Sequence, residues 1–165
     1  LSDIAGLKFN DKDEIAYITQ TTLSVDDTNN IISELRKKFP KIKSSPKEDI
    51  CYATTNRQNA IKVYAPKCDS FIVIGSKNSS NSNRLVEVAS NSGCKNVCLL
   101  EDASKLNLEE YNSSEVIGIS SGASVPDILV TQVVAKFEEH FKVDIEFAKY
   151  GEENVSFKLP KELRK

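Results

Sequence analysis

The sequence predicts an α/β fold built from repeated small units, each with a mostly parallel sheet. Apolar runs rich in β-branched residues alternate with segments in which apolar residues keep helical spacing. Strands that alternate with helices are joined by right-handed crossovers, which makes neighbouring strands parallel. Three strand-like runs are each followed by a loop rich in hydroxyl or amide side chains, at residues 19–24, 76–82 and 120–124. If the units face each other, all three loops can line one central cavity.

The composition is that of an ordinary globular protein, with 39% of the 165 residues hydrophobic and 28% charged. The net charge of −2 gives no electrostatic reason to expect binding to nucleic acid or to an anionic membrane. No apolar run approaches the length of a membrane span, and the N-terminal residues lack the features of a signal peptide, so we expect a cytoplasmic protein. The chain contains no methionine, which leads us to expect a fragment or a processed C-terminal portion.

The first unit is expected over residues 1–46. A short strand is predicted over residues 15–19, followed by a helix that begins at Ser24, where an aspartate three positions later completes a capping-box-like start. Apolar residues keep helical spacing until Pro40 ends the helix. The polar connector over residues 41–49 is the best candidate for a boundary between units.

The second unit is expected over residues 47–140 and is centred on residues 70–75. The unbroken apolar run at residues 71–74 predicts a fully buried parallel strand, which ends at Gly75 where the backbone turns. The polar loop after it leads into a helix that runs to Asn91. The other elements predicted from spacing are helices over residues 55–65 and 108–111 and strands over residues 97–100 and 116–119.

A last helix is predicted after the third polar loop. Ser124 stands where an N-cap residue would, and Pro126 falls in the first turn. Residues 141–165 are expected to form a tail. Within it we predict two strand-like pieces and an extended end, at residues 143–147, 154–157 and 159–162.

The polar loops offer neutral hydrogen-bond donors and helix N-termini, which together suit a phosphate or diphosphate. Helix capping is the competing explanation, since serine and asparagine cap helices in many proteins. For Ser24 and Ser124, capping explains the residue at least as well as ligand contact does. Capping cannot occupy Ser79, Ser80 and Asn81 together, so ligand contact is favoured there. None of the loops has the spacing of a P-loop or of a dinucleotide-binding fingerprint.

The four cysteines differ in their sequence surroundings. Cys51 lies among polar residues, which suits an exposed thiolate or a metal ligand, whereas Cys98 lies between apolar residues and is most simply a buried side chain. Cys68 and Cys94 are weak ligand candidates. A single cysteine is not a metal site, so both interpretations of Cys51 stay open. The only histidine, His140, is expected in a solvated position, and no catalytic triad can be assembled from it.

Four polar motifs follow each other along most of the chain: TQTTLSVDD at residues 19–27, ICYATTNRQ at 50–58, GSKNSSNSNRL at 75–85, and GAS followed by Pro126 at 122–126. Together they resemble the 4-hydroxy-3-methylbut-2-enyl diphosphate reductases, the LytB/IspH family of the non-mevalonate isoprenoid pathway. The resemblance implies a fold of three α/β units around a central cavity that holds a 4Fe-4S cluster. It also implies reductive removal of the allylic hydroxyl of the substrate, which yields isopentenyl and dimethylallyl diphosphate.

Matched residue by residue, the resemblance implies that Cys51 is one cluster ligand and that Thr21 lies by the substrate hydroxyl. Thr54 would then lie near the cluster. The diphosphate would be held by Ser79, Ser80, Asn81 and Ser124.

The family's other two cluster cysteines, its diphosphate-binding histidines and its proton-relay glutamate belong to N-terminal motifs that this sequence lacks. We therefore expect no catalytic residue in this chain, which resembles the second half of the middle unit, the third unit and the tail. Activity would need the N-terminal part of the protein and an electron donor such as a ferredoxin or flavodoxin. In a eukaryote, the location would be a plastid-type organelle. Two alternatives stay open: a metal-independent phosphate-binding module and a purely structural α/β domain.

Overall fold

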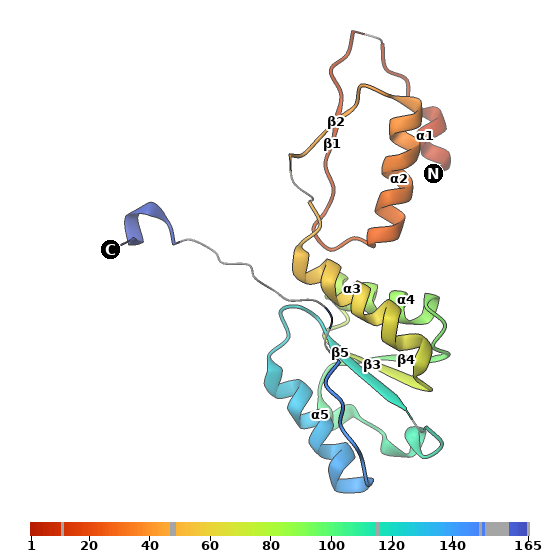
Figure 1. Cartoon of the computed structure of the whole chain (residues 1–165), viewed down its shortest axis with the longest axis vertical. Helices are drawn as coiled ribbons and strands as arrows, with labels where there is room; N and C mark the ends of the chain where they lie inside the picture. The colour runs from red at the N-terminus through yellow and green to blue at the C-terminus, as the bar shows by residue number, and fades with distance from the viewer. Residues whose placement is uncertain (11, 47–48, 115, 149, 151–158, 165) are drawn as a thin grey trace.

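The computed structural model describes residues 1–10, 12–46, 49–114, 116–148, 150 and 159–164. Its strands form two separate parallel sheets, one of two strands and one of three (Figure 1). The predicted α/β fold with parallel sheets is therefore confirmed. None of the described helices has the length and apolar character that crossing a bilayer requires.

The first sheet pairs β1 (Ala16–Tyr17) with β2 (Lys43–Ser44), and the helix between them is α2 (Val25–Lys38). A short helix, α1 (Ser2–Gly6), precedes them. Ser24 is the N-cap of α2, as predicted, because its Oγ accepts a hydrogen bond from the Asp27 N–H at 3.2 Å. Strand β2 was not predicted, since both of its residues are exposed and polar and the sequence there is that of a connector.

The second sheet has β3 (Ser70–Ile74) at its centre, between β4 (Asn96–Leu100) and β5 (Ile117–Ser121). Both neighbours run parallel to β3. All five residues of β3 are buried, which agrees with the prediction from the unbroken apolar run. Because the three strands are parallel and in register, their carboxyl ends lie along one edge of the sheet.

Helices cover both faces of the second sheet (Figure 1). Alternate residues of β3 point to opposite sides: Phe71 and Val73 pack in a core with α3 (Tyr52–Tyr64) and α4 (Ser80–Asn91), whereas Ile72 and Ile74 pack in a second core with α5 (Asp127–His140). Three short 3₁₀ helices lie between these elements: η1 (Ala65–Lys67), η2 (Ala103–Lys105) and η3 (Leu108–Tyr111). The result is a three-layer α/β/α arrangement around β3.

Several predicted boundaries differ from the structure. Helix α3 begins at Tyr52 rather than at residue 55, so most of the polar motif at residues 50–58 is helical. Helix α5 begins at Asp127 with Pro126 at the N-cap, so the prediction that Ser124 caps it was wrong. Residues 143–147 contain no strand, and the last residues include a 3₁₀ helix, η4 (Lys161–Leu163), where an extended end was predicted. The strand predicted at 154–157 lies outside the described residues.

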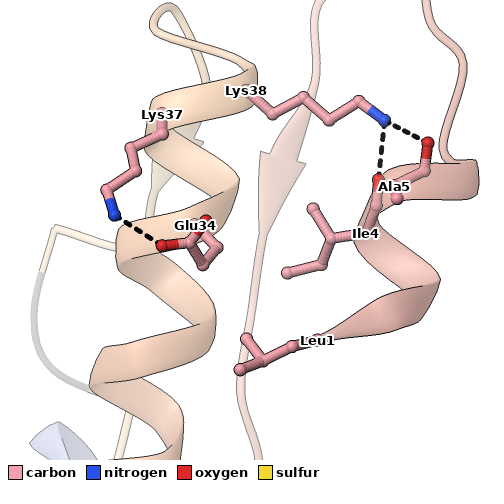
Figure 2. A pocket seen from close by; sticks show the side chains of 6 residues that line it. All are labelled: Leu1, Ile4, Ala5, Glu34, Lys37 and Lys38. Carbon is pink, nitrogen blue, oxygen red and sulfur yellow. Dashed lines mark hydrogen bonds and ion pairs between the residues drawn. The ribbon is translucent and has the colours of Figure 1, made fainter.

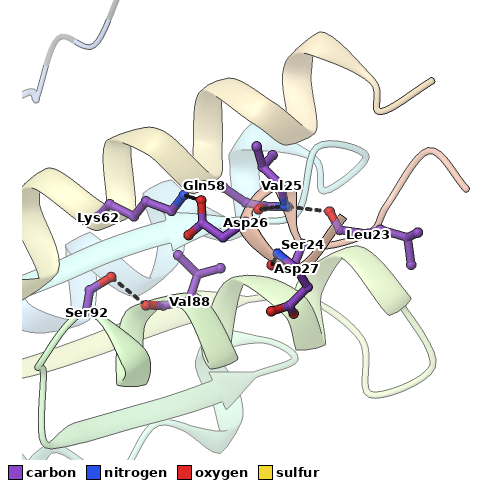
Figure 3. A network of polar contacts seen from close by, with 9 residues as sticks. All are labelled: Leu23, Ser24, Val25, Asp26, Asp27, Gln58, Lys62, Val88 and Ser92. Atoms are coloured by element: carbon purple, nitrogen blue, oxygen red, sulfur yellow. Dashed lines mark hydrogen bonds and ion pairs between the residues drawn. The ribbon is translucent and has the colours of Figure 1, made fainter. Parts of the chain in front are cut away.

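Gln58 joins the two parts of the fold. Its side chain is fully buried; Oε1 accepts from the Val25 N–H at 3.0 Å and Nε2 donates to the Leu23 carbonyl at 2.9 Å (Figure 3). An ion pair between Lys62 and Asp26, at 2.7 Å, lies beside these bonds. The start of α2 is thereby fixed against α3. The predicted boundary at residue 46, like the tail boundary at residue 141, stays a prediction.

Replacing Gln58 with alanine is expected to destabilise the protein by ~2 kcal/mol, because it leaves a backbone N–H and a backbone carbonyl without their partners. Urea unfolding followed by circular dichroism would measure the change. Gln132→Ala, at an exposed position on α5, is the matched control and should leave the midpoint unchanged. Equal midpoints for both variants would contradict the joining role of Gln58.

Candidate functional site at the carboxyl edge of the sheet

The ends of β3 and β5 meet around one buried serine, Ser82. Gly75 follows β3 and Gly122 follows β5, and the Gly122 N–H donates to the Ile74 carbonyl at 2.9 Å. A Cβ atom added at Gly75 would lie 2.7 Å from Ser82 Cβ, and one added at Gly122 would lie 2.6 Å from Ser82 Oγ. Both strand ends therefore need glycine so that the first turn of α4 can approach them.

The loop between β3 and α4 uses only one of its polar residues as a cap. Ser79 is the N-cap of α4: its Oγ accepts from the Ser82 N–H at 3.2 Å and from the Ser82 hydroxyl at 3.0 Å. Ser80 is exposed in the first turn. This agrees with the prediction that capping cannot occupy all three residues of the motif.

Asn81 is buried and has an unused polar atom. Its side chain is 9% exposed, and its Oδ1 has no hydrogen-bond partner among the described residues. The backbone N–H groups of Ser80 and Asn81 lie in the first turn of a helix, where no earlier helical carbonyl can accept them. The N–H groups at this helix N-terminus favour an anionic ligand, whereas the Asn81 Oδ1 is an acceptor and favours a ligand group that donates a hydrogen bond, such as a hydroxyl.

The turn after β5 lies next to this loop. The Val125 N–H donates to the Gly122 carbonyl at 3.0 Å, which closes a turn that contains the exposed Ser124. A Cβ added at Gly122 would lie 3.8 Å from Asn81 Nδ2. The structure thus brings the predicted residues Asn81 and Ser124 to the same edge of the sheet, on neighbouring loops.

Cys51 lies at the N-cap of α3 with an exposed side chain. Its N–H donates to the Thr21 carbonyl at 3.1 Å, so the first polar loop lies against the start of α3. Thr54 is one turn further along the helix and is 2% exposed. The thiol is therefore accessible from outside the described part of the chain.

The other three cysteines have structural surroundings. Cys94 packs in the core with α3 and α4, and its Sγ lies 3.5 Å from the Cys68 carbonyl oxygen. Burial, followed by the nearby Cys94, raises the pKa of the Cys68 thiol, which disfavours the thiolate that metals need. The Cys98 thiol lies 3.3 Å from the Tyr111 hydroxyl, whose pKa is raised mainly by burial. No group of three or more histidine, cysteine, aspartate or glutamate side chains that could hold a metal occurs within the described ranges.

His140 is exposed at the end of α5 and packs edge-on against Phe141. This agrees with the solvated position that was predicted for it.

Sequence reasoning missed Arg57. One nitrogen of its guanidinium, Nη1, donates to both the Ser121 carbonyl and the Ser121 Oγ, each at 3.1 Å. The bond connects α3 to the last residue of β5. The available signal was its position in the helical repeat, because Arg57 adjoins the buried positions Thr54, Gln58 and Ile61.

Two hollows of the described structure lie away from these residues. The first, of about 430 Å³, lies between α1 and α2 and is lined by Leu1, Ile4, Ala5, Glu34, Lys37 and Lys38 (Figure 2). The second, of about 200 Å³, lies beside the junction of α2, α3 and α4 and includes Ser24 and Arg84. Neither contains a predicted site residue. A single cavity shared by all three polar loops stays a prediction, which the contacts from Thr21 to Cys51 and from Arg57 to Ser121 support pairwise.

Known proteins are similar to this chain over most of its length. The sequence model of the family described as LytB protein matches residues 2–138. Relatives named 4-hydroxy-3-methylbut-2-enyl diphosphate reductase include proteins of Roseobacter denitrificans and Beijerinckia indica, each 48% identical over 98% of this chain. A relative from Rhodopseudomonas palustris, named 4-hydroxy-3-methylbut-2-enyl diphosphate reductase 2, is 45% identical over 99% of the chain. The chain spans about half the length (51%) of each of these relatives.

Two solved structures are also similar. The E-1-hydroxy-2-methyl-but-2-enyl-4-diphosphate reductase from Plasmodium falciparum matches with a TM-score of 0.88 and 35% identity, over 98% of this chain and 51% of that protein. A second structure, of an (E)-4-hydroxy-3-methyl-but-2-enyl diphosphate reductase, matches with a TM-score of 0.54 and 32% identity over 76% of this chain and 44% of that one. The matched motifs, the fold and the extent of the family match agree: this chain belongs to the LytB protein family.

Proposed function

We propose that this chain is part of an iron-sulfur reductase that converts (E)-4-hydroxy-3-methylbut-2-enyl diphosphate to isopentenyl and dimethylallyl diphosphate. The observation that supports it most is the arrangement at the carboxyl edge of the second sheet. There the buried Asn81 amide, the N-terminus of α4 and the Ser124 turn lie together. The names of the relatives support the same substrate. Activity requires the remainder of the full-length protein, because this chain spans only half of its relatives.

In this proposal the residues of this chain that contact the diphosphate are neutral hydrogen-bond donors. Ser80 and Ser124 present exposed hydroxyls, Asn81 presents a buried amide, and Ser79 holds the helix start in place as its cap. The helix N-terminus adds a partial positive charge. Neutral donors of this kind can stabilise the phosphate oxygens of an anionic ligand.

In the same proposal Cys51 supplies one of three thiolate ligands of a 4Fe-4S cluster, and the remainder of the protein supplies the other two. The exposed thiol at the start of α3 fits that role, since a ligand shared between parts of a protein must be accessible. When bound, such a cluster supplies electrons from a donor such as a ferredoxin or flavodoxin. Two electrons and two protons then release the allylic hydroxyl as water. Thr21 precedes Cys51 along the chain and is proposed to contact the substrate hydroxyl. Thr54, one turn into α3 and 2% exposed, is proposed to lie near the cluster.

Calorimetry of the full-length protein with the allylic diphosphate tests the binding site. Asn81→Ala and Ser80→Ala should each weaken binding by ~1.5 to 3 kcal/mol, because each removes a hydrogen bond to a charged group. Ser90→Ala is the matched control, since Ser90 is exposed on the same helix but far from its N-terminus. If all three variants bind as the unchanged protein does, the diphosphate does not occupy this edge.

The competing function is a metal-independent module that binds phosphate or diphosphate at the same edge. The buried Asn81 with its unused Oδ1 supports this module as much as it supports the reductase, because neither role of Asn81 requires a metal cluster. The two functions differ in what is expected of Cys51: the reductase needs its thiolate as a cluster ligand, and the phosphate-binding module does not.

A further inference from the structure

Arg57 bridges the helix that begins at Cys51 and the strand that leads to Ser124. It lies six residues after Cys51 on α3, and its guanidinium crosses to the end of β5. There a single nitrogen donates to the carbonyl oxygen and to the hydroxyl of Ser121, which is 5% exposed. Two bonds to the same buried residue fix both its backbone and its side chain relative to α3.

The position of Ser121 determines that of the turn after it. The next residue, Gly122, donates its N–H to the Ile74 carbonyl and accepts from the Val125 N–H, so Ser124 is held in a turn with a fixed start. That start has two anchors, β3 through Ile74 and α3 through Arg57. The α3 anchor sets where the Ser124 hydroxyl lies relative to the helix of Cys51.

Arg57 also differs electrostatically from the cations near it. Lys62 and Arg84 each pair with a carboxylate, Asp26 at 2.7 Å and Asp27 at 3.6 Å respectively. Within the described part of the chain, no carboxylate lies within the 4.0 Å of an ion pair with Arg57, although its side chain is partly buried. A partly buried positive charge that lacks a counter-ion favours an anion nearby.

We propose that Arg57 is a positioning residue for the reductase: it holds the Ser124 turn at the correct distance from the Cys51 helix and supplies positive charge to the diphosphate end of the site. This inference rests on the proposed function. Arg57 acts through Ser121 and through its electrostatic field, without contacting the reacting atoms.

The test uses the full-length protein with a reconstituted cluster. Arg57→Gln should raise the KM for the allylic diphosphate about tenfold or more, as expected for loss of hydrogen bonds from a charged group, with a smaller change in kcat and with cluster absorbance unchanged. Arg57→Lys, which keeps the charge and one donor nitrogen, should restore most of the affinity. Ser121→Ala removes one acceptor and should give an intermediate KM.

Lys62→Gln is the matched control, because it removes a cation from the same helix that is paired with Asp26, and it should leave KM unchanged. A wild-type KM in Arg57→Gln would overturn the proposal. Loss of cluster absorbance in both Arg57→Gln and Arg57→Lys would also overturn it, since Arg57 would then maintain the fold of the cluster region. If the protein without any substitution neither held a cluster nor turned over substrate, the proposed function itself would be refuted.

Discussion

Cys51→Ser in the full-length protein is expected to abolish most of the broad visible absorbance of a 4Fe-4S cluster after anaerobic reconstitution. Iron-sulfur clusters are held by cysteine thiolates, and a serine hydroxyl is a far weaker ligand at neutral pH. The structure places this thiol in an exposed position at the start of α3, next to the Thr21 loop. Reductase activity should disappear together with the absorbance, while circular dichroism should show an unchanged fold.

Cys68→Ser is the matched control for this experiment. Its thiol donates to the Tyr64 carbonyl at 3.3 Å, a bond that a serine hydroxyl can make in its place. The variant should therefore keep full absorbance. If Cys51→Ser also kept full absorbance, the reductase proposal would be wrong and the metal-independent phosphate module would take its place.

Gly75→Ala is expected to lower the free energy of unfolding by ~3 kcal/mol, because the added methyl group overlaps the fully buried Ser82. Gly122→Ala should cost somewhat less, ~2 kcal/mol, since only the Ser82 hydroxyl lies within 3.0 Å of the added atom, whereas at Gly75 the Ser82 Cβ does so as well. Neither glycine has a positive φ, so both effects come from packing rather than from backbone strain. Urea unfolding measures both, and both variants should also weaken diphosphate binding.

Ser82→Ala separates the two clashes. It removes the hydroxyl, 2.6 Å from a Cβ at Gly122, but keeps the Cβ that lies 2.7 Å from one at Gly75. The double variant Gly122→Ala/Ser82→Ala should therefore be more stable than the sum of its single changes predicts, whereas Gly75→Ala/Ser82→Ala should show much less rescue. Equal coupling in both pairs would contradict the packing described for this edge.

The elements that the sequence predicted best are those in which burial and local preference agree. Strand β3 contains an unbroken apolar run at residues 71–74 that is buried on both faces, and α2 has a serine cap, regular apolar spacing and a proline after its end. Strand β2 could not be predicted, because its two residues are exposed and only pairing with β1 makes them a strand. The start of α5 was misplaced for a similar reason: Ser124 has the chemistry of a cap, but the helix begins three residues later.

The sequence predicted which residues belong to the candidate site, but not how their side chains are arranged. The sequence indicates that the residues at 79–81 cannot all be caps, but only the structure shows that Ser79 is the cap and that Asn81 is buried with an unused oxygen. The link between Arg57 and Ser121 joins residues 64 positions apart, and no local pattern encodes such a contact. Side-chain contacts across elements depend on how the helices pack, which periodicity does not determine.

The burial of β3 limits how often the carboxyl edge of the second sheet can open. Each of its five residues is buried and it is paired on both sides, so its amide protons should exchange with solvent only when the whole domain opens. The two-residue ladder of β1 and β2 should exchange far sooner. Gly75 and Gly122 are hydrogen-bonded to the ends of this sheet, so we expect the edge that carries Asn81 and Ser124 to open as rarely as β3 does. The Thr21 loop, next to the smaller sheet, should open more often.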